Sequence, residues 1–257
     1  MRCVILAGGR GTRISEESHL RPKPMIEIGP RPILWHIMKH YSHHGVDDFI
    51  ICLGYRGYMI KEYFMNYYLH NSDVTVDVRM NTLTYHHTRA ESWRVTLVDT
   101  GEATMTGGRV KRVGRYLDGS EPFFLTYGDG VSDIDLTAEL AFHRKHGCLA
   151  TMTVVRPPAR FGSSVVDEDR VVEFREKAQA SEGLINGGYF VMSPDVLEIL
   201  TDDSAALETT GLATLVEMGQ LRAWQHEGFW QPMDTLREKE LLDRLWAEGA
   251  APWKVWH

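Results

Sequence analysis

Glycines and basic side chains follow directly on a short apolar run near the start of the chain. Residues 3–7 are apolar and lead into Gly8-Gly9-Arg10-Gly11-Thr12-Arg13, with Lys23 shortly after. Glycines let the backbone turn sharply and direct its N–H groups toward a ligand, while Arg13 and Lys23 offer positive charge. At the carboxyl end of a buried strand, this combination is typical of polyphosphate binding. A glycine-rich surface turn with solvated arginines accounts for the glycines equally well.

Two common phosphate motifs do not match this loop. A P-loop requires Gly-Lys-Ser/Thr where Arg13 and Ile14 stand, and the dinucleotide fingerprint has Ile14 in place of its last glycine. The segment Arg21-Pro22-Lys23-Pro24 predicts extended chain after the loop, because a residue before proline disfavours helix. The loop therefore indicates a different nucleotide-binding design.

Two acidic turns further along the chain could supply a metal site. Asp129 follows the apolar run 122–127 in Gly128-Asp129-Gly130, and Asp234 follows the segment 228–233. A carboxylate at the same edge of a parallel sheet as the first loop can hold a divalent cation, and a plain Asp-Gly turn is the alternative. Two carboxylates among cations suit a magnesium-bound triphosphate. Further polar side chains at the ends of segments are Arg109, Lys177 and Asn186.

Strands and helices alternate along the chain in an order that would place these residues at one edge. The pattern predicts an α/β fold with a parallel, doubly wound sheet. We expect one domain over 1–257, with a small β excursion at 71–100, a glycine turn at 104–109 and a C-terminal helix and tail at 236–257. Predicted strands lie at 48–53, 122–127, 150–155 and 185–192, a hairpin at 165–174, and helices at 32–41, 58–64 and 136–147.

The composition limits the possible settings and partners. The 257 residues are 43% hydrophobic and 25% charged, and the net charge of −7 argues against bulk nucleic-acid or anionic-membrane binding. The cysteines are widely spaced without a C-x-x-C pair, which predicts buried free thiols. His36 and His40 lie four apart without a carboxylate, so a packed or solvated helix face is favoured over a metal site. We find no signal peptide or membrane span and expect a cytoplasmic protein.

Longer runs of the sequence resemble a known family. GGRGTR followed by RPKP is similar to the signature of the sugar-1-phosphate nucleotidyltransferases, and much more of the chain resembles their glucose-1-phosphate cytidylyltransferase branch. That resemblance implies the nucleotide-diphospho-sugar transferase fold, a Rossmann-like, mostly parallel mixed sheet flanked by helices. It also implies Mg²⁺ and oligomers built on threefold association (trimer or hexamer). It also implies the reaction of CTP with α-D-glucose 1-phosphate to CDP-glucose and pyrophosphate, an entry step to dideoxy sugars of bacterial surface polysaccharides such as O-antigen. The runs include ILAGGRGTRISEESHLRPKPMIEIG, PILWHIMKHYSHHGVDDFIICLGY, FLTYGDGVSDID, INGGYFVMSP and GFWQPMDTLREK.

The resemblance also implies roles for individual residues. Catalysis would involve Arg13, Lys23, Asp129 and Asp234, and the last two would bind Mg²⁺. The sugar phosphate would contact Glu176, Lys177, Asn186 and Gly187. The nucleotide would contact Leu6, Ala7, Gly8, Gly9, Gly11, Thr12, Arg13, Lys23, Thr104, Arg109 and Gly128.

The chain departs from the family pattern near the expected sugar pocket. The usual Glu-Lys-Pro reads Glu176-Lys177-Ala178, and the segment 161–166 also differs. The alternatives are therefore another sugar 1-phosphate, UTP or dTTP in place of CTP, or a catalytically silent nucleotide-sensing homologue. The segment 71–93 and the tryptophan-rich tail are candidates for subunit contacts, and Trp253 and Trp256 of the tail are expected to pack on the body.

Overall fold

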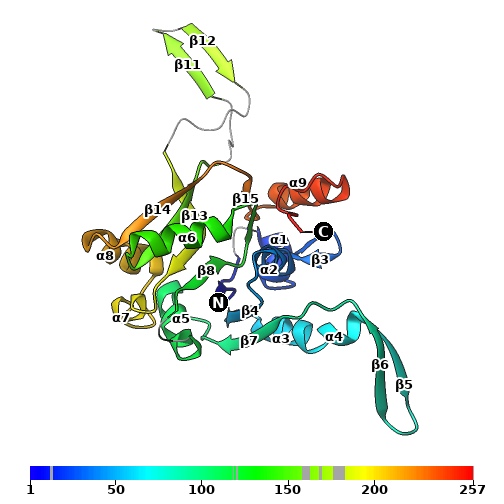
Figure 1. Ribbon diagram of the computed structural model, residues 1–257. Coiled ribbons are helices and arrows are strands. Elements are labelled where there is room, and N and C mark those ends of the chain that lie inside the picture. Colours follow the sequence, from blue (N-terminus) through cyan, green and yellow to red (C-terminus); the bar gives the residue numbers. More distant parts are fainter. Residues whose placement is uncertain are drawn as a thin grey trace.

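A seven-stranded sheet forms the centre of the computed structural model, which describes residues 1–11, 14–117, 119, 121–157, 163–167, 170–175 and 183–256 (Figure 1). The strand order is β14-β10-β13-β8-β1-β4-β7, and β13 runs antiparallel to both of its neighbours while the other pairs are parallel. The predicted mostly parallel mixed sheet is confirmed. Its strands are β1 (Arg2–Leu6), β4 (Asp48–Leu53), β7 (Arg94–Asp99), β8 (Phe123–Tyr127), β10 (Ala150–Val155), β13 (Ile185–Met192) and β14 (Leu221–His226).

Helices cover both faces of the sheet. The side chains of each central strand point alternately to the two faces, and each face packs against helices in its own hydrophobic core. Cys3 and Ile5 of β1 belong to one buried cluster, whereas Val4 and Leu6 belong to the other. On the first side pack α2 (Ile33–His43), α3 (Gly57–Met65), α6 (Leu136–His146) and α9 (Leu236–Ala247). On the second side pack α5 (Thr106–Val113), α7 (Val196–Ile199), the π-helical turn η4 (Leu207–Gly211) and α8 (Leu212–Glu217).

Short strand pairs and turns complete the described fold. The hairpin of β5 (Ser72–Asp77) and β6 (Thr82–Thr88) extends away from the body (Figure 1). The predicted excursion is therefore narrower than 71–100, because β7 pairs with β4 at the edge of the main sheet. The remaining elements are α1 (Ser15–Ser18), η2 (Lys23–Met25), β2 (Glu27–Ile28), β3 (Arg31–Pro32), α4 (Tyr67–His70), η3 (Gly114–Tyr116), β9 (Gly130–Ser132), β11 (Ser163–Asp167), β12 (Arg170–Arg175) and β15 (Trp230–Pro232).

The predicted glycine turn at 104–109 is wrong, because Gly107 and Gly108 lie in the first turns of α5. A Cβ atom at Gly107 would lie 2.7 Å from the carbonyl oxygen of Ala205, so the helix packs directly on the backbone before η4. Close packing of this kind excludes any larger side chain there. The glycines therefore serve helix packing instead of a turn.

Other sequence-based expectations are confirmed. The three cysteines are buried free thiols. His36 and His40 are buried with their Nε2 atoms 2.9 Å from backbone carbonyl oxygens, and burial lowers their pKa values to about 4 and about 3. Trp253 and Trp256 of the tail pack into the core. Across the described ranges, no helix is both long and apolar enough to cross a bilayer.

A buried carboxyl group in α6 makes the stability depend on pH. Glu139 is fully buried, and burial raises its pKa from 4.5 to about 7, although a hydrogen bond from Thr153 at 2.6 Å acts in the opposite direction. Its contribution to stability is therefore present below pH 4.5 and lost as the pH rises to about 7. Relative to the wild type, we expect the free energy of unfolding of Glu139→Gln to rise by about 2 to 3 kcal/mol from pH 5 to pH 8.

Urea unfolding at the two pH values measures this gain in the free energy of unfolding. The exposed Glu217→Gln serves as the control and should show no such difference. An equal pH dependence in Glu139→Gln and the wild type would contradict the assignment.

Candidate active site

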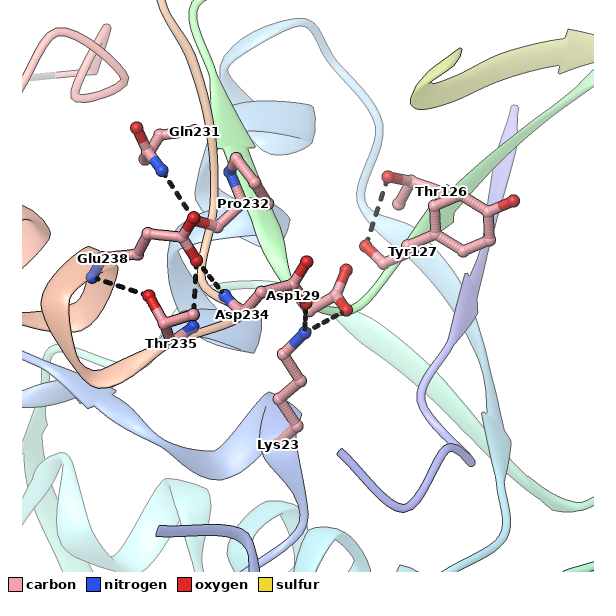
Figure 2. A network of polar contacts seen from close by, with 9 residues as sticks. All are labelled: Lys23, Thr126, Tyr127, Asp129, Gln231, Pro232, Asp234, Thr235 and Glu238. Atoms are coloured by element: carbon pink, nitrogen blue, oxygen red, sulfur yellow. Dashed lines mark hydrogen bonds and ion pairs between the residues drawn. The ribbon is translucent and has the colours of Figure 1, made fainter. Parts of the chain in front are cut away.

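The ammonium group of Lys23 joins two carboxylates at the edge of the sheet (Figure 2). Its Nζ atom lies 2.6 Å from Oδ2 of Asp129 and 2.5 Å from Oδ1 of Asp234. Lys23 and Asp234 are buried, whereas the Asp129 side chain is 32% exposed, so the cluster opens to solvent on one side. The structure thus brings together the three residues to which the sequence analysis assigned charge neutralisation and metal binding.

Pairing of two short strands brings the carboxylates together. β9 and β15 are antiparallel, with Gly130 opposite Pro232, and the backbone N–H of Met233 donates to the carbonyl of Asp129 at 2.8 Å. Asp129 therefore directly precedes β9, and Asp234 follows β15 at the same end of this strand pair. Backbone pairing in this way fixes the two carboxylates more firmly than loops alone would.

The start of α9 orients Asp234, and the sequence analysis missed the residue that does so. Glu238 accepts hydrogen bonds from the backbone N–H groups of Asp234 at 2.7 Å and Thr235 at 2.9 Å, while its own N–H donates to the Thr235 hydroxyl at 3.3 Å. This is a capping box, which the spacing Thr-x-x-Glu before a helix indicates. That spacing was the available signal for Glu238.

Lys23 lies at the beginning of the 3₁₀-helix η2, so the predicted extended chain from 21 to 24 is wrong there. Pro22 is extended with φ −65° and ψ 145°, and Pro24 follows in the first turn. Proline is favoured in a first helical turn because its fixed φ suits the helix and its missing N–H is not needed. The one-turn helix α1 also lies between the glycine loop and this segment.

Arg109 lies behind the glycine loop and ties three segments together. Its guanidinium donates to the carbonyl oxygens of Leu53 at 2.9 Å and Gly8 at 3.3 Å, and to the Thr100 hydroxyl at 2.8 Å. A fourth bond reaches the carbonyl of Glu102 at 3.3 Å. Burial lowers the pKa of Arg109, and a Cβ atom at Gly8 would lie 2.0 Å from its Nη1. The position of Arg109 therefore requires glycine in the loop.

Replacing Arg109 by methionine is expected to lower the free energy of unfolding by about 2 to 4 kcal/mol, because buried acceptors lose a charged donor. The same change should weaken nucleotide binding, since Gly8 loses a support. Denaturant unfolding and nucleotide titration measure the two effects. Arg112→Met is a matched control in the same helix, since Arg112 pairs with Asp203 at the surface. Equal stability of both variants would contradict the role of Arg109.

The other predicted nucleotide contacts lie along the edge formed by β1 and β8. The Gly128 N–H donates to the carbonyl of Leu6 at 3.0 Å, and the Ala7 N–H donates to that of Cys52 at 3.0 Å. Thr104 is buried before α5, while Gly9 is exposed in the loop. Leu6, Ala7, Gly8, Gly9, Gly11, Thr104, Arg109 and Gly128 remain predicted contacts.

The predicted sugar side lies at the beginning of β13. Oδ1 of Asn186 accepts a hydrogen bond from the Gly188 N–H at 2.8 Å, and the Gly187 carbonyl accepts one from the Trp230 indole at 2.7 Å. Trp230 belongs to β15, so this side is connected to the strand that precedes Asp234. Four predicted site residues lie outside the described residues, namely Thr12, Arg13, Glu176 and Lys177.

The donor set of the cluster fits a hard divalent cation. Both carboxylates already converge on one positive charge, the Lys23 ammonium, at hydrogen-bonding distance. Nowhere in the described part of the chain do three or more His, Cys, Asp or Glu side chains form a metal-binding group. Mg²⁺ typically takes one or two protein carboxylates and completes its shell with water and substrate phosphates. Asp129 and Asp234 fit that pattern together with a bound nucleotide.

A mostly parallel α/β sheet with a glycine loop and a carboxylate pair at one edge is typical of nucleotide-binding proteins. The family model described as "Nucleotidyl transferase" matches residues 2–233. The glucose-1-phosphate cytidylyltransferase of Salmonella typhi is 55% identical over all of both chains. The probable glucose-1-phosphate cytidylyltransferase of Bacillus subtilis is 40% identical, again over all of both chains.

The chain belongs to the nucleotidyl transferase family and, within it, to the glucose-1-phosphate cytidylyltransferases. Among solved structures, HddC from Yersinia pseudotuberculosis has a TM-score of 0.70 at 23% identity, covering 95% of this chain and 99% of that one. That likeness confirms the fold. The sequence-based family assignment and the expectation of an enzyme are confirmed by the close relatives.

Proposed function

We propose that the protein transfers CMP from CTP to α-D-glucose 1-phosphate, giving CDP-glucose and pyrophosphate. The observation that supports this most directly is the cluster of Lys23, Asp129 and Asp234 beside the glycine loop. Full-length identity of 55% to a glucose-1-phosphate cytidylyltransferase supports the choice of substrates. Phosphoryl-group transfer needs positive charge and positioning, which this cluster and loop supply.

Asp129 and Asp234 would hold Mg²⁺, the divalent metal that we propose for this site. When bound, Mg²⁺ would neutralise charge on the nucleotide phosphates and on the departing pyrophosphate. Because the pair already accommodates an ammonium group, its geometry tolerates a positive charge at this point. Arg13 and Gly11 would hold the triphosphate beside it.

The chemistry we propose is an in-line displacement at the α-phosphorus. A phosphate oxygen of the sugar 1-phosphate attacks the α-phosphorus of CTP, and the bond to the oxygen bridging to the β-phosphorus breaks, releasing pyrophosphate. The attacking phosphate is already anionic at neutral pH, so no general base is required. Lys23 would neutralise charge that develops on the α-phosphate oxygens. Positioning by the loop and charge neutralisation then account for catalysis.

The sugar phosphate would be held on the β13 side. Lys177 would contact its phosphate, and Glu176, Asn186 and Gly187 would contact the sugar. Because Ala178 replaces the proline of the family pattern, this side is where a different sugar 1-phosphate would be accommodated. We expect the reaction to take place in the cytoplasm and its product to be used for dideoxy sugars of surface polysaccharides.

We further propose a homo-oligomer, a trimer or a hexamer. The β5–β6 hairpin supports this, because an isolated two-stranded hairpin is marginally stable and this one exposes large apolar side chains. Light scattering of the purified protein measures the stoichiometry, and a monomer at micromolar concentration would contradict it. The exposed side chains are Val76, Val78, Met80, Leu83 and Tyr85.

A panel of nucleotides and sugar phosphates tests the proposed function. CTP, UTP, dTTP and GTP are each combined with several hexose 1-phosphates and Mg²⁺, and pyrophosphate release is followed. We expect the highest kcat/KM with CTP and glucose 1-phosphate. Higher values for another pair would reassign the substrates, and tight nucleotide binding without pyrophosphate release would identify a sensor instead of an enzyme.

A further inference from the structure

Glu208 connects the beginning of α5 to the end of β8. Its carboxylate accepts a hydrogen bond from the Tyr127 hydroxyl at 2.5 Å and another from the Thr106 hydroxyl at 2.7 Å. Nothing in the sequence pattern marked Glu208, which lies in an exposed turn between two short helices. A carboxylate that receives two hydroxyl donors is ordered, because charge-assisted hydrogen bonds are about twice as strong as neutral ones.

The turn that presents Glu208 is held against α5. η4 is π-helical, and the Leu207 N–H donates to the Thr106 hydroxyl at 2.8 Å, while the Gly108 N–H donates to the Ala205 carbonyl at 3.1 Å. Single π-helical turns are rare and occur frequently at functional sites. Thr106 therefore fixes both the backbone and the side chain of this turn.

Tyr127 lies between Glu208 and the predicted sugar side. It is the last residue of β8 and pairs with Leu6 of β1, directly before the turn that contains Asp129. In Figure 2 its phenol points away from the cluster of Lys23 and the two carboxylates. A Cβ atom at Gly188 would lie 2.5 Å from Cδ2 of Tyr127, so the ring packs directly on the backbone that follows Asn186.

The hydrogen-bond directions in this group are set by the carboxylate. Glu208 only accepts, so the single proton of the Tyr127 hydroxyl is donated to it. Burial and the Glu208 charge raise the pKa of Tyr127. The ring that the carboxylate holds packs on Gly188, whose N–H donates to Oδ1 of Asn186 at 2.8 Å. The oxygen end of the Asn186 amide is thereby assigned.

We propose that Glu208 is a positioning residue that acts through Tyr127 and Gly188 to orient the Asn186 amide toward a hydroxyl of the sugar. This inference rests on the proposed function of the site. An amide oriented in this way retains its N–H donors and one Oδ1 lone pair by count, which matches a sugar hydroxyl that both donates and accepts. Without the carboxylate, the Tyr127 ring is no longer held against Gly188, and the hydrogen bond that orients the Asn186 amide is weakened.

Steady-state kinetics of the full-length enzyme with Mg²⁺, CTP and glucose 1-phosphate test this role. Glu208→Gln and Tyr127→Phe preserve side-chain shape, and each should raise the KM for glucose 1-phosphate about tenfold. The KM for CTP and the Tm should stay at the wild-type values. The double variant should resemble Tyr127→Phe alone, because Glu208 acts only through that hydroxyl.

Glu217→Gln, an exposed change in α8, is the matched control and should behave as the wild type. Equal increases in both KM values, additive effects in the double variant, or an unchanged KM for glucose 1-phosphate would each overturn the inference. If Asn186→Ala raises that KM while Tyr127→Phe leaves it unchanged, the inference fails and the proposed function stands. Absence of pyrophosphate release by the wild type would overturn the proposed function and the inference together.

Discussion

Asp129→Asn and Asp234→Asn are each expected to lower the kcat for CMP transfer by about 10³-fold. Each change removes one negative charge from the pair that would hold the metal, while side-chain volume is preserved. The capping box beside Asp234 uses its backbone N–H and not its carboxylate, so α9 should remain intact in the variant. Pyrophosphate release at saturating CTP and glucose 1-phosphate measures the loss.

Asp135→Asn is a suitable control for the acidic substitutions. Asp135 caps α6 by accepting from the Ala138 N–H at 2.9 Å, and asparagine caps a helix equally well. Its kcat should equal that of the wild type. Normal turnover in both site variants would show that the carboxylate pair does not bind the metal.

Lys23→Met is expected to lower kcat by about 10²-fold and the free energy of unfolding by about 2 kcal/mol. The side chain is 7% exposed, and its removal leaves Asp129 and Asp234 facing each other without a cation. Added Mg²⁺ or Mn²⁺ should take the place of the lost charge. We therefore expect divalent ions to raise the Tm of Lys23→Met more than that of the wild type.

Thermal unfolding with and without about 10 mM Mg²⁺ separates this effect from catalysis. Lys39→Met provides the control, because Lys39 pairs with Glu91 at 3.5 Å and is also largely covered. Its Tm should respond to Mg²⁺ as the wild type does. An equal response of Lys23→Met would show that Lys23 and the metal do not share the carboxylates.

The sequence predicted the central sheet because most of its strands are short apolar runs, and such runs indicate strands that are buried on both faces. β8 and the second half of β13 are mostly hydrophobic stretches, and the turn after β8 contains Asp129. Because β1 and β8 are parallel, the glycine loop after β1 and the turn after β8 lie at one edge of the sheet. This rule placed Asp129 beside the glycine loop, whereas Asp234 reaches the same edge through the antiparallel pairing of β15 with β9.

Contacts between distant segments could not be predicted from residue types. Arg109 reads as a basic residue of a glycine turn, yet its guanidinium is buried under Gly8 because three separate carbonyl groups face it. Glu208 resembles any exposed acidic residue until Tyr127 and Thr106 are seen to donate to it. Such pairings depend on tertiary packing, which local patterns do not encode.

The pairing of β9 with β15 also determines when the site can exist during synthesis. Lys23 and Asp234 are 211 residues apart, so a ribosome must release most of the chain before both can meet. The first strands and the glycine loop emerge early, whereas the second carboxylate emerges close to the end. A nascent chain that stops before β15 is therefore expected to lack the complete cation site. Ribosome-bound chains halted at successive lengths should acquire Mn²⁺-dependent nucleotide binding only after residue 234 has left the exit tunnel.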